Sequence, residues 1–116
     1  MNIEEIQGKE IEVIEFNLIV HENKSMISMK FLINDEVVRM IFHNVSSLNI
    51  KDFSMPYQIG GFEILDNNDR GWEKSRRYSI NDYEDGTIKF YCESFEIIWI
   101  IKTAECFHSA VVVASG

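Results

Sequence analysis

The sequence predicts an all-β protein, a single antiparallel β-sandwich of about seven or eight strands, with a partly closed β-barrel as the alternative. Three observations lead to this fold class. Apolar residues alternate with polar ones along most of the chain. Helical periodicity persists nowhere, and Asn, Asp and Gly turn signals separate the apolar segments. With 116 residues, of which 46% are hydrophobic, residues 1–116 fit one domain with a real core.

Residues 11–20 predict one long strand with an irregularity in it. Two apolar sets follow each other, Ile11 and Val13 and then Phe16, Leu18 and Val20. The alternation changes phase at Ile14-Glu15. One extra residue in the strand, a β-bulge, would produce this change.

Three further strands follow in the middle of the chain. Residues 27–33 and 37–43 alternate in hydrophobicity, and Asn34-Asp35-Glu36 is a suitable hairpin turn between them. Residues 44–56 are predicted to be irregular. Residues 57–65 are predicted to form the next strand, with Gly60-Gly61 marking a bend or a bulge.

Residues 78–93 predict a hairpin whose register follows from burial. A two-residue Asp85-Gly86 turn would set Asp82 opposite Lys89, an exposed ion pair that contributes at most ~1 kcal/mol. A three-residue loop of residues 84–86 instead buries an Ile and a Phe, which contributes roughly 1.5 to 3 kcal/mol for each. We therefore predict the longer loop, with Gly86 in the left-handed conformation. Its register pairs Ile80 with Phe90 and Tyr78 with Cys92.

The residue pattern of the last strands favours a sandwich over a barrel. Residues 95–102 are apolar on both faces, which is typical of a central strand that is covered on both sides. A sandwich supplies that cover more readily than a barrel with a solvated exterior. Residues 110–114 form either a C-terminal strand or a frayed tail.

Charge and apolar run length exclude several classes of function. The formal net charge of -8 argues against nucleic acid as a partner, because phosphate backbones require clustered Lys and Arg. The N-terminus lacks the character of a signal peptide, and the apolar runs are far shorter than the ~20 residues of a membrane helix. A cytoplasmic protein with no membrane contact is expected, in which Cys92 and Cys106 are reduced thiols.

The stretch DNNDRGW, residues 66–72, has some features of a calcium loop. An EF-hand starting at Asp66 would have Asn68 and Gly71 at suitable positions. However, Arg70 and Arg77 occupy two positions that require oxygen ligands. The stretch is therefore predicted to be a polar turn.

No catalytic residue, metal site or cofactor is predicted. Cys92, Cys106 and His108 lack a fourth ligand and the close Cys pairs of structural zinc sites. The chain contains no nucleophile elbow, phosphate-binding loop or dinucleotide fingerprint. An enzyme is therefore not expected.

Basic residues gather in one segment of this acidic chain. Four of the eleven basic residues lie between positions 70 and 77, around Trp72. Arg, Trp and Tyr are enriched at interaction hot spots. The predicted contact surface consists of Arg70, Trp72, Arg76, Arg77 and Tyr78. The alternative is that Trp72 closes one end of the core while the arginines pair with nearby carboxylates.

Three segments, FHNVSSLNI, GFEILDNNDRGW and RRYSINDYEDGTIKFYC, resemble small uncharacterised proteins of Gram-positive bacteria. The similarity covers roughly residues 40–97. Some of these proteins lie near polymorphic toxin genes and are suspected of immunity roles. The resemblance implies a non-enzymatic, intracellular protein that neutralises a toxin domain by direct contact. The net acidity is compatible with a basic partner.

Two other binding modes are consistent with the sequence. The apolar C-terminal stretch AVVVA, residues 110–114, would make a homodimer by adding a strand to a sheet edge. A small ligand such as a sugar would need aromatic side chains stacked at the sheet surface. The candidates for that role are Tyr57, Trp72, Tyr83 and Tyr91.

Overall fold

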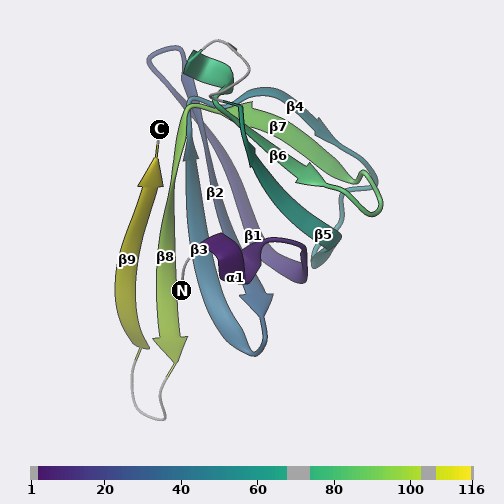
Figure 1. Ribbon diagram of the computed structural model, residues 1–116, viewed down its shortest axis with the longest axis vertical. Coiled ribbons are helices and arrows are strands. Elements are labelled where there is room, and N and C mark those ends of the chain that lie inside the picture. The colour runs from purple at the N-terminus through teal and green to yellow at the C-terminus, as the bar shows by residue number, and fades with distance from the viewer. Residues whose placement is uncertain (1–2, 68–73, 103–106, 116) are drawn as a thin grey trace.

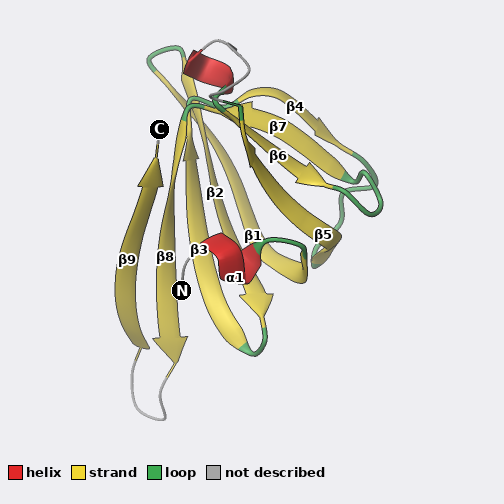
Figure 2. Cartoon of the chain, viewed as in Figure 1, coloured by secondary structure: helices red, strands yellow, loops and turns green. Residues whose placement is uncertain are grey.

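The computed structural model describes residues 3–67, 74–102 and 107–115. Within these residues nine strands form one antiparallel sheet in the order β4-β7-β6-β5-β1-β2-β3-β8-β9 (Figure 1). The strands are β1 (Lys9–His21), β2 (Lys24–Ile33), β3 (Glu36–His43), β4 (Ser46–Ile50), β5 (Tyr57–Asp66), β6 (Tyr78–Asp82), β7 (Ile88–Cys92), β8 (Ser94–Lys102) and β9 (Phe107–Ser115). Two short helices, α1 (Ile3–Ile6) and the 3-10 helix η2 (Lys74–Arg76), complete the described chain (Figure 2). In these ranges no helix is long and apolar enough to cross a bilayer.

The sheet is rolled around one core. Strand β3 leads directly into β4, and β7 leads directly into β8, so both stretches cross from one half of the sheet to the other. Figure 1 shows β4 to β7 splayed away from β1, β2, β3, β8 and β9. Aromatic rings join the halves, because Phe42 of β3 lies 5.0 Å from Phe90 of β7 and Phe31 of β2 lies 6.0 Å from Phe62 of β5. The predicted all-β antiparallel fold is confirmed: the single sheet is not closed, and both the predicted sandwich and the alternative open barrel fit it.

The strand count differs from the prediction at one place. Residues 44–56 were predicted to be irregular, but residues 46–50 form β4 at one edge of the sheet. Only Leu48 and Ile50 of this strand are apolar and half-buried. Such a short alternation does not identify a strand in the sequence. The C-terminal strand, one of two predicted outcomes, is present as β9, which pairs with β8.

Both predicted irregularities are confirmed. In β1, Val13 pairs with Phe31 whereas Glu15 pairs with Lys30, so Ile14 is the extra residue of a bulge. In β5, the register with β1 shifts across Gly60-Gly61. A Cβ atom on Gly61 would lie 2.5 Å from the Tyr83 ring, which explains why a glycine is needed there.

The hairpin of β6 and β7 has the predicted register. Ile80 pairs with Phe90 and Tyr78 with Cys92, and Gly86 has a φ of 63°. The strands end earlier than predicted, so the loop consists of residues 83–87.

The core is filled by large apolar side chains from both halves of the sheet. Five phenylalanines are fully buried, namely Phe31, Phe42, Phe62, Phe90 and Phe95. Helix α1 covers part of the sheet with Ile6, which is also fully buried. Next to it, the Gln7 side chain donates to the Ile64 carbonyl and accepts from the Ile64 amide, at 2.6 and 2.9 Å. Gln7 thus continues the ladder of β5 where β1 has not yet begun.

Candidate functional site

The second half of β1 has a neighbour on one side only. Strand β2 pairs with β1 as far as His21, opposite Lys24. On the other side, β5 begins at Tyr57, opposite Val13. In the part of the chain that the structure describes, no strand pairs with this side of residues 14–21. We call residues 14–21 the free edge of β1.

The free edge carries exposed apolar side chains. Leu18 is 51% exposed and Val20 68%, and Ile14 and Ile19 are exposed as well. The Phe16 ring, half-buried on the same face as Leu18, contacts Phe53 at a centroid distance of 5.6 Å. Natural proteins usually protect sheet edges with charges, proline or covering segments. An exposed apolar edge of this kind is typical of an interaction surface.

The turn that follows β1 determines which backbone groups face outward. Glu22 and Asn23 both have positive φ, 50° and 64°, and form a two-residue connection of the type I′ class. In such a hairpin the flanking pair, His21 and Lys24, is hydrogen-bonded, and the bonded pairs alternate along the ladder. The amides and carbonyls of Phe16, Leu18 and Val20 therefore point toward the free edge. These same residues carry the apolar side chains on the core-facing side.

The predicted contact surface around Trp72 is described only in part. Arg70 and Trp72 lie outside the described residues. Arg76 is exposed, and its guanidinium carbon lies 5.0 Å from the ring centroid of Tyr91 on β7. The Lys89 ammonium lies 5.7 Å from the same centroid. Arg76, Lys89 and Tyr91 form a basic-aromatic cluster on the outer face of the sheet, which the sequence analysis found only through Arg76.

Two other members of the predicted surface have structural contacts. Tyr78 is only 7% exposed and packs edge-on against Phe95 at 4.9 Å, so it is a core residue rather than part of an exposed surface. Arg77 is half-buried, with its guanidinium over the Tyr78 ring at 5.2 Å and 3.5 Å from an Asp66 oxygen. Tyr78, Ile80 and Asp82 are every second residue of β6, and this alternation places Tyr78 on the inner face of the sheet. The prediction of Tyr78 as a contact residue, based on residue type, is therefore wrong.

Asn67 links the end of β5 to the start of β6 by hydrogen bonds. Its amide N–H donates to the Arg77 carbonyl at 2.6 Å. Its side-chain amide donates to the Arg76 carbonyl at 3.1 Å and to the Ser79 hydroxyl at 2.7 Å. Because Asn67 is buried, these bonds hold the start of β6 against the end of β5.

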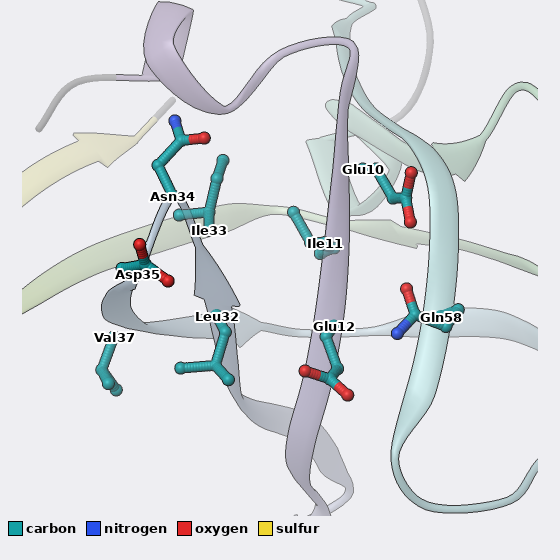
Figure 3. Close-up of a pocket in the computed structure, with 9 residues that line it drawn as sticks. All are labelled: Glu10, Ile11, Glu12, Leu32, Ile33, Asn34, Asp35, Val37 and Gln58. Atoms are coloured by element: carbon teal, nitrogen blue, oxygen red, sulfur yellow. The ribbon is translucent and has the colours of Figure 1, made fainter.

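One hollow lies where β1 passes the turn between β2 and β3. It is lined by Glu10, Glu12, Asp35, Asn34 and Gln58 together with the apolar Ile11, Leu32, Ile33 and Val37. Figure 3 shows the carboxylates of Glu10 and Asp35 on opposite sides of the view, with Glu12 between them. This arrangement favours cationic groups over anionic ones, in agreement with the net charge.

A second hollow lies at the other end of β2, beside the β1–β2 turn. Its lining includes His21, Lys24, His43 and Glu93. Glu93 accepts hydrogen bonds from Asn44 at 3.0 Å and from Lys74 at 3.3 Å. The bond from Asn44 lowers the pKa of Glu93, and Lys74 lowers it further, against the opposing effect of burial. The hollow thus presents an ionised carboxylate and polar groups to a ligand.

Metal and thiol chemistry find no support in the described residues. Within residues 3–67, 74–102 and 107–115, no three His, Cys, Asp or Glu side chains are grouped to bind a metal ion. Burial raises the pKa of the Cys92 thiol to about 12, so it is not a thiolate at neutral pH. The side chains of Cys106 and His108 are not described.

The aromatic residues proposed for sugar stacking do not form an open platform. Tyr57 is buried, and its single hydroxyl proton is shared between the carbonyls of Lys51 and Thr87, whose oxygens lie 2.9 and 2.7 Å from the hydroxyl oxygen. Tyr91 lies beneath Arg76 and Lys89. Tyr83 is exposed, but its ring packs over Gly61.

No family model, curated protein or solved structure matches this chain. The resemblance to immunity-type proteins therefore stays a prediction.

Proposed function

We propose that this chain is a non-enzymatic, cytoplasmic protein-binding module that takes up an extended segment of its partner along the free edge of β1. One observation carries the proposal. Phe16, Leu18 and Val20 combine outward-facing backbone groups with apolar side chains, and Leu18 and Val20 are more than half exposed. An added strand would use both features at once.

The expected gain from such an addition comes from two sources. Each new backbone hydrogen bond contributes about 0.5 to 1.5 kcal/mol net. Covering apolar surface contributes roughly 25 cal/mol for each Å² removed from water. Residues 16–20, FNLIV, contain no charge and no proline that would oppose pairing.

The proposed class of heterologous partner is a toxin domain that the chain neutralises by direct contact. The resemblance to proteins near toxin genes implies this class. The net charge of -8 favours a partner with a basic surface and would accelerate its association. The acidic hollow of Glu10, Glu12 and Asp35 lies along the first half of the same strand.

Capture from an extract of the source organism tests this function. The baits are the wild type, Leu18→Lys and Leu65→Lys. Leu18→Lys places a charge on the apolar side of the free edge. Leu65→Lys makes the same change at an exposed leucine of β5 that lies outside the free edge and pairs with Ser79 of β6.

We expect the same protein on the wild-type and Leu65→Lys baits and its loss from Leu18→Lys. Thermal unfolding of all three should agree within about 3 °C, because exposed substitutions have small effects on stability. Equal capture by the Leu18→Lys bait would show that partners do not use this edge.

A further inference from the structure

We infer that a second copy of this chain occupies the free edge of β1, as an antiparallel strand pair centred on Leu18. The resulting dimer has two-fold symmetry, and the two sheets join into one across β1. This inference rests on the proposed function, which assigns strand addition to the same edge; a second copy of the chain and a segment of a heterologous partner would compete for it.

The backbone geometry of the edge is self-complementary. With Leu18 on the two-fold axis, Phe16 lies opposite Val20 of the partner subunit, and Leu18 lies opposite its own copy. All three residues point their amides and carbonyls toward the free edge, as argued from the type I′ turn. Each of these pairs is therefore of the hydrogen-bonded kind. The pairing would form about six inter-chain hydrogen bonds, two for each pair.

The side chains agree with the same register. On the core-facing side, aromatic and aliphatic groups meet, Phe16 with the partner's Val20 and Leu18 with the partner's Leu18. Such cross-strand pairs stabilise sheets. At the ends, Glu15 lies opposite His21 of the partner subunit, so a carboxylate meets a group that is neutral or cationic rather than another carboxylate. Within residues 15–21 this register sets no carboxylate opposite another carboxylate.

Strand β5 itself does not pair with residues 14–21, although Phe53 of the segment before β5 contacts the Phe16 ring at 5.6 Å. Strand β5 starts at Tyr57, opposite Val13, and the partner's His21 would end opposite Glu15. The added strand therefore continues the line of β5 instead of competing with it.

A different edge, β4, is less suitable. It has five residues, its register with β7 is broken between Ser46 and Asn49, and Ser47 has a φ of 54°. These irregularities interrupt the straight row of donors and acceptors that strand addition requires.

Sedimentation equilibrium of the purified full-length chain tests the dimer. An interface formed by one strand pair is small, so we expect reversible dimerisation over roughly 1 to 500 µM. Leu18→Lys should weaken the association at least tenfold, whereas Leu65→Lys, outside the free edge, should dimerise as the wild type does. A wild type that is monomeric throughout, or a Leu18→Lys variant that dimerises equally well, would overturn the inference.

Disulfide trapping tests the register. Only the central residue of a two-fold strand pair lies opposite itself, at a Cα separation of about 5.5 Å, within the range of a disulfide. In a Cys106→Ser background, Leu18→Cys should form a covalent dimer under mild oxidation. Asn17→Cys should not, because Asn17 would lie opposite Ile19 of the partner subunit. Equally rapid trapping at position 17 would exclude a pair centred on Leu18.

The outcomes separate this inference from the proposed function. A monomeric wild type that still captures a protein through Leu18 would remove the self-pairing and keep the binding function. A dimer that depends on Leu18, with no captured protein, would confirm the self-pairing and remove the heterologous partner.

Discussion

The carboxylate of Asp82 accepts a hydrogen bond from the amide of Gly61 at 3.1 Å, which ties the β6–β7 hairpin to the bulge of β5. The same carboxylate accepts from the amides of Glu84, Asp85 and Thr87 and, at 2.5 Å, from the Thr87 hydroxyl. Asp82 is only 3% exposed. Burial alone would raise its pKa, but the hydrogen bonds from Thr87, Asp85 and Gly61 together lower the pKa below its usual value.

Replacing Asp82 by Asn should destabilise the fold in a pH-dependent way. The Asn side chain has an NH2 donor in place of one carboxylate oxygen, and this donor would face N–H groups that need an acceptor. We expect the free energy of unfolding to fall by about 3 kcal/mol at neutral pH. Because the folded pKa is lowered, the ionised carboxylate contributes its full stability above the unfolded pKa of about 3.9, and this contribution disappears as the pH falls through the folded pKa. Urea unfolding at about pH 7 and about pH 3 measures the difference, which should shrink at the lower pH.

Asp85→Asn is the matched control for this change. Asp85 is exposed and lies three residues further along in the same turn, so its replacement should change stability by less than about 0.5 kcal/mol. An equal loss for Asp82→Asn at both pH values would contradict the role of the ionised carboxylate.

Gly61→Ala should destabilise the protein through its clash with Tyr83. The new Cβ would lie 2.5 Å from a ring carbon of Tyr83, so the ring must move and its hydroxyl bond to the Gly8 carbonyl must break. We expect a cost of about 1 to 2 kcal/mol. In a Tyr83→Ala background the same change should cost less than about 0.5 kcal/mol, which a double-mutant cycle measures. Additive losses would mean that Tyr83 is not the obstacle.

Cys92 should resist thiol reagents in the folded protein. It is fully buried, and desolvation raises its pKa to about 12, so the reactive thiolate is absent at neutral pH. In a Cys106→Ser background, alkylation followed by mass spectrometry should proceed only as fast as the chain unfolds. Rapid labelling without denaturant would contradict the buried position of Cys92.

Replacing Arg77 by Ala should reduce stability more than replacing Arg76 by Ala. Arg77→Ala removes a half-buried guanidinium from Tyr78 and Asp66, and we expect a loss of about 1 to 2 kcal/mol. Arg76→Ala removes an exposed side chain from Tyr91 and should cost about 0.5 kcal/mol. Chemical denaturation of both variants tests this order, and a larger loss for Arg76→Ala would reverse it.

Local pattern in the sequence determined most of the strands and their irregularities. The phase change at Ile14 predicted the bulge of β1, and the apolar pairs of residues 78–92 predicted the hairpin register, because both depend on residues close in the chain. The same kind of evidence missed β4, whose pairing with β7 joins residues about forty apart. Local sequence also predicted Tyr78 to be a contact residue, although the position of Tyr78 on the inner face makes it part of the core.

The free edge of β1 was decided by tertiary structure alone. Leu18 and Val20 alternate after the bulge as Ile11 and Val13 do before it, and in the sequence nothing distinguishes the exposed pair from the buried one. Ile11 and Val13 are covered because β5, more than forty residues later, pairs beside them and ends its contact at Tyr57. Alternation of apolar and polar residues shows which side chains lie on the same face of a strand. Whether another strand pairs beside that part of the strand depends on segments from distant parts of the chain.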